Sequence, residues 1–153
     1  MEIRLKTPGR LLNPAGGFLA DYTHTLNPYA GCAFGCSYCY VRRMPVGMFR
    51  SEPWGEWVDV KRMDREAFRK EWQRARGRGR MTVFVGSATD PYQPAEARFG
   101  VTRALLEIMA EAPADFVLLQ TRSPLVVRDA DLLRRLGPRV RVSMTIETDL
   151  ESV

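Results

Sequence analysis

The chain has 153 residues, of which 45% are hydrophobic and 27% are charged, the composition of one globular domain with a real core. Its longest apolar runs, such as residues 116–119, are too short to span a membrane. Residues 1–6 lack the apolar core of a signal peptide. These features argue against a membrane-spanning or secreted protein, and we expect a cytoplasmic location.

The positive charge of the chain leaves two interpretations open. The formal net charge is +5 and comes mostly from arginine. Only residues 62–80 carry closely spaced positive charges. They form either an ordinary solvated surface or a surface that attracts the phosphates of nucleic acid.

The first third of the chain shows little periodicity. Residues 1–21 are expected to form an irregular lead-in, because residues 8–17 alone contain two prolines and three glycines. Residues 23–29 predict a short strand, and the prolines, glycines and tryptophans of residues 44–57 predict an ordered loop.

The remainder alternates apolar, strand-like runs with helical segments. Asp64 is a good N-cap for a helix that ends at Gly77, and Thr102 is expected to cap the next helix. Such alternation predicts a parallel α/β sheet, whose strand–helix loops all lie on one side. The further expected elements are strands over 81–85, 116–119 and 140–146 and a helix over 129–136. The loops expected on the shared side are residues 30–40, 86–96, 121–124 and 143–148.

The number of strand–helix units decides what kind of α/β fold this is. About four units are present, whereas a closed (β/α) barrel usually needs about 200 residues or more. We therefore predict a partial (β/α) barrel over residues 22–153, the N-terminal portion of a longer barrel. The end of the sequence at residues 149–153, where a helix would begin, supports a truncated domain.

Cysteine usage is the most informative feature of the composition. The chain has three cysteines, Cys32, Cys36 and Cys39, with the spacing Cys-x3-Cys-x2-Cys. A secreted disulfide framework would spread an even number of cysteines along the chain. Three thiolates in one short loop instead predict a metal site, with room for three corners of an iron–sulfur cluster.

The same cysteines allow two alternatives to a cluster. The three cysteines and His24, the single histidine, could form a zinc site of the Cys3His type. The loop could also hold no metal, in which case neighbouring thiols would oxidise in air. His24 lies upstream in a strand-like run, so we expect it to pack beside the strand.

The cysteine loop resembles that of the radical S-adenosylmethionine (radical SAM) superfamily. The likeness rests on the Cys-x3-Cys-x2-Cys order with Tyr38 as the aromatic residue before the last cysteine. Residues 25–40 and residues 89–96, Thr-Asp-Pro-Tyr-Gln-Pro-Ala-Glu, resemble the branch related to spore photoproduct lyase. Together the likeness covers roughly residues 22–148 and implies a radical SAM-like partial barrel.

The resemblance implies a 4Fe–4S cluster and S-adenosylmethionine as cofactors. Three cysteines leave one iron of the cluster open, and that iron can chelate the amino and carboxylate groups of S-adenosylmethionine. One electron from the reduced cluster then splits a carbon–sulfur bond and releases a 5′-deoxyadenosyl radical. A reductant such as flavodoxin or ferredoxin is implied as a partner.

The resemblance also names residues for the S-adenosylmethionine site. The loop after the second strand should hold the methionine amino group, and here Ser87 offers a hydroxyl and Asp90 an acceptor. The Gly-Gly-Glu sequence that is usual at this place is absent. Arg122 could pair with the methionine carboxylate, where related enzymes often have lysine. Tyr38 and Ser143 complete the candidate set, with Ser143 expected near the ribose or the carboxylate.

Each of these residues also has an ordinary structural interpretation. Ser87 and Asp90 could serve only a turn, Arg122 could be a surface residue, and Ser143 could be a strand residue facing the barrel interior. Three functions therefore stay open. They are a radical SAM enzyme of unknown substrate, a DNA photoproduct repair lyase, and a non-catalytic domain that binds zinc or a cluster.

Overall fold

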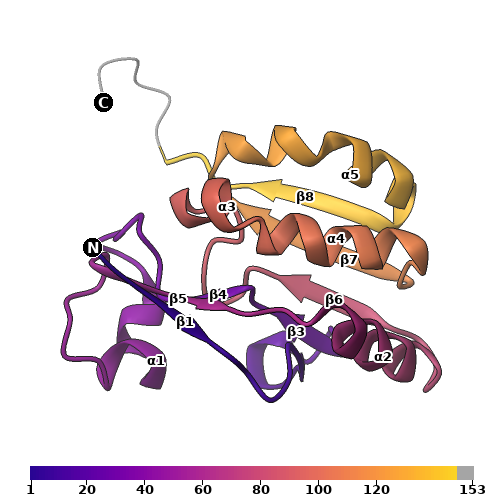
Figure 1. Cartoon of the computed structure of the whole chain (residues 1–153), viewed down its shortest axis with the longest axis horizontal. Coiled ribbons are helices and arrows are strands. Elements are labelled where there is room, and N and C mark those ends of the chain that lie inside the picture. The colour runs from indigo at the N-terminus through magenta and orange to yellow at the C-terminus, as the bar shows by residue number, and fades with distance from the viewer. Residues whose placement is uncertain (148–153) are drawn as a thin grey trace.

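A computed structural model describes residues 1–147 of the chain (Figure 1). Its larger sheet has five strands in the order β2-β3-β6-β7-β8. The last four are parallel, whereas β2 pairs with β3 in the antiparallel sense. The predicted parallel α/β fold is therefore confirmed. These strands are β2 (Leu12–Pro14), β3 (His24–Leu26), β6 (Thr82–Val85), β7 (Phe116–Thr121) and β8 (Val140–Met144).

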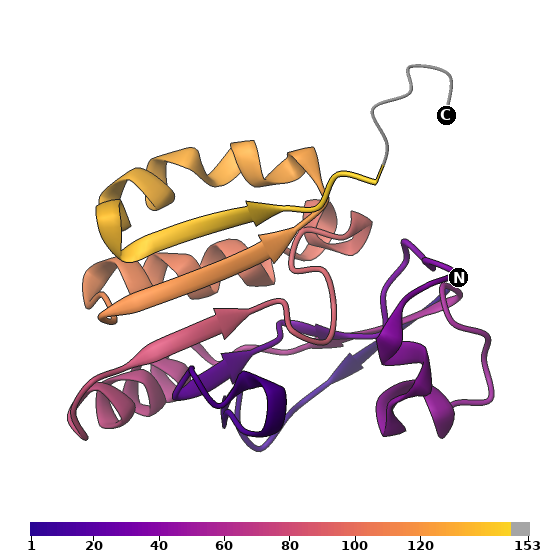
Figure 2. The ribbon, with the colours of Figure 1, turned by 180° about the vertical axis from the view of Figure 1, so that it is seen from behind.

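The main helices cover one face of this sheet. In Figure 1 they lie in front of the strands, and in Figure 2, from behind, the strands face the viewer. Neighbouring strands are joined through helices on this face, as expected for part of a (β/α) barrel. The helices are α2 (Arg65–Arg76), α4 (Val101–Glu111) and α5 (Ala130–Leu136), with 3-10 turns η3 (Pro124–Asp129) and η4 (Gly137–Arg139) flanking α5.

The core lies between this sheet and its helices. Val83 and Val117 are paired in register, are fully buried, and share the sheet face that the helices cover. Trp72 and Leu105 are buried from the helix side. On the opposite face, Phe84, Leu118 and Arg141 form one row across three strands and are only partly buried or exposed. This uncovered face corresponds to the interior of a barrel.

A second, smaller sheet corrects the expectation for the first third of the chain. Its order is β1-β5-β4, so the lead-in expected to be irregular contains β1, paired in parallel with β5. The expected loop over 44–57 contains a helix and ends where β5 begins. The strand expected over 23–29 is divided between two sheets as β3 and β4. The elements are β1 (Glu2–Lys6), η1 (Gly17–Leu19), β4 (Tyr29–Ala30), η2 (Tyr40–Arg43), α1 (Pro45–Met48) and β5 (Trp57–Lys61).

The helix starts show one confirmed cap and one correction. The Asp64 side chain accepts a hydrogen bond from the Ala67 amide at 2.9 Å, as predicted for an N-cap. Thr102 does not cap α4, because its hydroxyl donates to the Pro91 carbonyl. The amide of Thr102 instead donates to the carboxylate of Glu96 at 2.8 Å. Glu96 belongs to a short helix that the sequence did not predict, α3 (Pro94–Phe99).

Two expectations concern the end of the chain. The strand expected over 140–146 ends at Met144, and the helix start expected over 149–153 lies outside the described residues. Among the described residues, none of the helices combines the length and apolar character needed to cross a bilayer.

Candidate cofactor site

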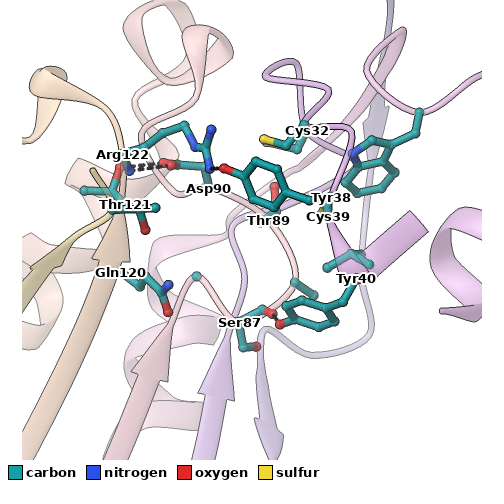
Figure 3. Close-up of a pocket in the computed structure, with 16 residues that line it drawn as sticks. Cys32, Tyr38, Cys39, Tyr40, Ser87, Thr89, Asp90, Gln120, Thr121 and Arg122 are labelled. Atoms are coloured by element: carbon teal, nitrogen blue, oxygen red, sulfur yellow. Dashed lines mark hydrogen bonds between the residues drawn. The ribbon is translucent and has the colours of Figure 1, made fainter. Parts of the chain in front are cut away.

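A pocket of about 280 Å³ lies at the carboxyl ends of the parallel strands (Figure 3). It brings together the cysteine loop, the loop after β6 and the end of β7. Seven of the eight predicted site residues line it, although they come from distant parts of the sequence, as the predicted common side requires. The lining residues are Cys32, Cys36, Tyr38, Cys39, Tyr40, Val41, Trp54, Gly86, Ser87, Ala88, Thr89, Asp90, Gln120, Thr121, Arg122 and Thr145.

The backbone of the cysteine loop is held against β5. Gly31 has a φ of +74°, and a Cβ at this position would lie 2.5 Å from the Trp57 carbonyl oxygen. Only glycine fits there, because a side chain would be strained by the backbone and would clash with Trp57. Cys32, the next residue, is buried, whereas Cys36 and Cys39 are partly exposed.

The loop after β6 fixes the same backbone from the other side. Gln93 is fully buried and its side-chain oxygen accepts a hydrogen bond from the Ala33 amide at 2.9 Å. Its side-chain nitrogen donates to the Gly31 carbonyl at 3.2 Å, and the Thr89 hydroxyl donates to the same carbonyl at 2.6 Å. The residues on both sides of Cys32 are therefore bonded to one buried side chain.

Three further hydrogen bonds join the cysteine-loop segment to residues 87–96. Asn27 donates to the Ser87 hydroxyl at 3.0 Å and accepts from the Ala88 amide at 2.8 Å. The Tyr29 hydroxyl donates to the buried carboxylate of Glu96. Burial and the neighbouring Glu96 carboxylate raise the pKa of Tyr29, which keeps it a proton donor. Segments 25–40 and 89–96 thus form one bonded unit.

Asp90 connects the loop after β6 to the end of β7. Its carboxylate accepts from the Thr121 hydroxyl at 2.6 Å and from the Arg122 amide at 2.8 Å. It also accepts from the Tyr92 amide at 2.8 Å. These three bonds give Asp90 a positioning role for the Arg122 backbone, and its predicted contact with an ammonium group stays a prediction.

Arg122 lies against the aromatic residues of the cysteine loop. Its guanidinium carbon is 5.7 Å from the ring centres of Phe34 and Tyr38, and it donates to the Tyr38 hydroxyl at 2.6 Å. It also forms an ion pair with Glu147. Figure 3 shows Tyr38 and Arg122 pointing toward one another beside Asp90. Tyr38 and Arg122, two separate site predictions, thus meet at one wall of the pocket.

The remaining predicted residues have different places. Ser87 lines the pocket, and its carbonyl accepts from the Tyr40 hydroxyl. Ser143 pairs with Gln120 in the sheet but does not line the pocket, which is reached instead by Thr145, two residues further on. Its predicted cofactor contact stays a prediction.

Zinc ligation by His24 is not supported by its position. His24 begins β3, bonds to Thr23 and lines a different pocket with Arg10 and Arg74, whereas the cysteine loop follows the strand's other end. Within residues 1–147, no three His, Cys, Asp or Glu side chains are gathered to hold a single metal ion. A tetrahedral zinc site needs all its ligands within about 2.3 Å of one ion, whereas a cubane binds each thiolate at a separate iron.

The surroundings of Cys32 and Cys36 favour the protonated thiols while no metal is bound. Burial raises the pKa of Cys32 to about 11, and the backbone amides of Asp90 and Phe34 partly oppose this shift. Burial also raises the pKa of Cys36. Thiols of this kind are bound as thiolates only when a metal replaces the proton.

One buried donor in the pocket wall has no protein partner. The indole Nε1 of Trp54, a lining residue, is buried and makes no hydrogen bond to any described residue. A buried N–H without an acceptor costs free energy, so an acceptor such as a cluster sulfur fits this position. The three cysteine thiols as ligands, and the unpartnered N–H of Trp54 as a hydrogen-bond donor, together fit a cluster held by Cys32, Cys36 and Cys39.

Comparison with known proteins identifies the family. Residues 26–153 match the Radical SAM superfamily. The chain belongs to this superfamily. The chain is 30% identical over 146 residues to the uncharacterized protein MJ0683 of Methanocaldococcus jannaschii, covering 95% of this chain and 51% of that one. It is 31% identical to the uncharacterized protein Rv2578c of Mycobacterium tuberculosis, covering 82% and 37%.

The chain therefore spans about half the length of the curated relatives it matches, or less. An uncharacterized protein of Acidianus two-tailed virus, ORF301, is 34% identical, with 80% and 42% of the two chains covered. Among solved structures, a mutant of spore photoproduct lyase superposes with a TM-score of 0.68 at 13% identity, covering 94% of this chain and 39% of that one. This likeness shows that the two chains share a fold over the matched residues.

Several residues that line the pocket or hold the cysteine loop had no predicted role in the site. Gln93 and Asn27 lie in the segments that carried the resemblance, so their place there was a usable signal. Trp54 and Thr121 carried no such signal, because tryptophan near a glycine turn and threonine at a strand end are common packing residues.

Proposed function

We propose that this chain is the cofactor-binding part of a radical SAM enzyme that reductively cleaves S-adenosylmethionine to a 5′-deoxyadenosyl radical. The observation that carries the assignment is one pocket that joins three closely spaced cysteines to the polar loops after β6 and β7. The superfamily match supports the same chemistry. Free cysteines that bind a metal are expected in a reducing compartment such as the cytoplasm.

Cys32, Cys36 and Cys39 would hold a 4Fe–4S cluster, with one iron left free of protein ligands. When bound, the cluster supplies the electron that breaks the carbon–sulfur bond of S-adenosylmethionine. The chain's own residues supply the setting. Gln93 and Thr89 fix the loop backbone on both sides of Cys32.

The S-adenosylmethionine site would be formed by the wall that faces the cysteines. Ser87 presents a hydroxyl there, and Arg122 presents a guanidinium whose side chain is 20% exposed. A guanidinium is suited to bind the methionine carboxylate through two parallel hydrogen bonds. Glu147, now paired with Arg122, would give way to that carboxylate or remain beside the methionine ammonium.

Anaerobic reconstitution with iron and sulfide, followed by electron paramagnetic resonance, tests this assignment. We expect a reduced 4Fe–4S signal that changes when S-adenosylmethionine is added, together with formation of 5′-deoxyadenosine. Cys36→Ala should abolish the signal because it removes a cluster ligand, whereas the neighbouring substitution Ser37→Ala should keep it.

Metal analysis of the same samples addresses the alternative of a zinc domain. Tight binding of one zinc ion per chain, with no cluster formed in the presence of iron and sulfide, would refute the radical SAM assignment. A cluster whose spectrum ignores S-adenosylmethionine would refute the assignment of the cofactor-binding wall.

A further inference from the structure

An exposed surface of mixed character begins at the last cysteine. Cys39 precedes the 3-10 turn η2, which runs directly into α1. Met44, Met48 and Phe49 are 40%, 61% and 84% exposed. Three large apolar side chains within six residues are seldom all so exposed. Arg42 and Arg43 are exposed beside them. We call these five residues the η2–α1 surface.

This surface is physically continuous with the cysteine loop. Arg42 donates from its side chain to the Ser37 carbonyl at 2.7 Å, between Cys36 and Cys39. Its amide also bonds to the Cys39 carbonyl at 3.3 Å. In both ribbon views, α1 lies beyond the carboxyl ends of the parallel strands (Figures 1 and 2). The residues that line the pocket also lie at these ends.

The charge of this surface is positive and uncompensated. Neither Arg42 nor Arg43 forms an ion pair within residues 1–147. In the following segment, Glu52 pairs with Arg4 and Asp59 pairs with Arg50, and the exposed carboxylate of Glu56 pairs with neither Arg42 nor Arg43 within the described residues. A partner that docks here would therefore meet two guanidinium groups that no described carboxylate neutralises, beside an apolar centre.

We propose that the η2–α1 surface is the docking site for an acidic one-electron carrier protein of the flavodoxin or ferredoxin kind. This rests on the proposed function, in which the cluster held by the cysteines must be reduced. Electron transfer requires the donor's cofactor to approach the cluster closely, and this surface starts at a cluster ligand. Small apolar centres bordered by complementary charge suit the brief encounters of electron carriers.

The transfer itself needs no further reactant. The donor's reduced flavin or iron–sulfur centre loses one electron, and the chain's cluster gains that electron. No covalent bond forms or breaks in this step. Basic residues around the contact chiefly raise the rate of encounter with an acidic partner, so the effect is lost at high salt.

Stopped-flow reduction of the reconstituted full chain tests the docking site, with cluster absorbance as the readout. Reduced flavodoxin serves as the protein donor and dithionite as a small donor that needs no docking. We expect Arg43→Glu and Phe49→Asp each to lower the second-order rate with flavodoxin at least tenfold at low salt. Both variants should keep the wild-type rate with dithionite.

Arg134→Glu is the matched control, because Arg134 is also exposed and forms no ion pair within the described residues, but lies on α5. Unchanged rates of reduction by flavodoxin in both test variants would overturn the docking site. The η2–α1 surface would then be expected to pack against another segment of the protein or a second copy. An equal loss in Arg134→Glu would also overturn it, since general charge would then explain the effect. A chain whose absorbance dithionite does not bleach would refute the proposed function instead.

Discussion

The side-chain oxygen of Gln93 accepts a hydrogen bond from the amide of Ala33 at 2.9 Å, across 60 residues of sequence. Gln93 is fully buried in the loop that leads into α3, and Ala33 follows the first cysteine. The bond therefore couples the loop after β6 to the geometry of the cysteine loop. Because Gln93 also donates to the Gly31 carbonyl, the Cys32 backbone is held on both sides.

Removing this clamp should weaken both the fold and the cluster. Gln93→Leu leaves the Ala33 amide without its acceptor, and we expect a loss of about 2 kcal/mol in the free energy of unfolding. Iron content after anaerobic reconstitution should fall as well, because the thiols are less well positioned. Urea unfolding and iron analysis measure the two effects. Gln73→Leu, at an exposed position of α2, should change neither.

The buried carboxylate of Asp129 should matter more than its exposed neighbour. Asp129 is fully buried and is bonded by Arg103 at 2.8 Å, by Arg128 at 2.8 Å and by Tyr92 at 3.0 Å. Asp129→Asn should lower the free energy of unfolding by about 3 kcal/mol. This value is at the lower end of the range for breaking a buried ion pair, because both arginines are partly exposed. Asp131→Asn removes another partner of Arg103 at the surface, and its urea midpoint should stay close to wild type.

The same carboxylate predicts a pH dependence. Burial opposes ionisation of Asp129, yet the hydrogen bonds from Arg128, Arg103 and Tyr92 are stronger in sum and lower its pKa below the ordinary 3.8. A pKa that is lower in the folded state adds stability above pH 3.8, and this stability is lost as the pH falls below it. The difference in unfolding free energy between wild type and Asp129→Asn should therefore shrink between pH 6 and pH 3. A difference that stays constant over that range would assign the effect to packing alone.

The parallel sheet and the cysteine pocket were predictable because their signals are local. Apolar runs mark β6 and β7, and a cysteine triplet with fixed spacing marks the loop. The strand β1 was missed although residues 2–6, Glu-Ile-Arg-Leu-Lys, alternate charged and apolar residues as a half-buried strand does, because so short a run depends on its pairing with β5. The cap of α4 was misassigned because the acceptor for the Thr102 amide is Glu96, a buried carboxylate of the preceding helix. Both features depend on how separate elements pack together, which the local sequence pattern does not specify.

Arg122 should affect the affinity for S-adenosylmethionine without affecting the cluster. Arg122→Ala removes a charged hydrogen-bond donor from the pocket wall, and we expect the Kd to rise about tenfold, or about 1.4 kcal/mol. Arg122→Lys keeps the charge but loses the planar fork, so its Kd should lie between the two. Titration of the reduced cluster's paramagnetic resonance signal measures the affinity. The exposed residue Arg98 gives the control variant, Arg98→Ala, and a Kd raised equally there would contradict a local role.

Trp54 should tune the reduction potential of the cluster. Its indole Nε1 is buried in a residue that lines the pocket and has no partner among the described residues. A hydrogen bond from this N–H to a cluster sulfur would stabilise the reduced, more negative state and so raise the potential. Trp54→Phe should therefore lower the potential by about 40 mV, the equivalent of about 1 kcal/mol for one electron.

Trp57→Phe is the comparison that separates this effect from general loss of an indole. The Trp57 Nε1 is also buried without a partner among residues 1–147, but Trp57 packs behind Gly31 and does not line the pocket. Its replacement should lower stability while it leaves the potential nearly unchanged. Redox titration followed by paramagnetic resonance measures both variants. Equal shifts in the two, or no shift in Trp54→Phe, would show that the Trp54 N–H does not reach the cluster.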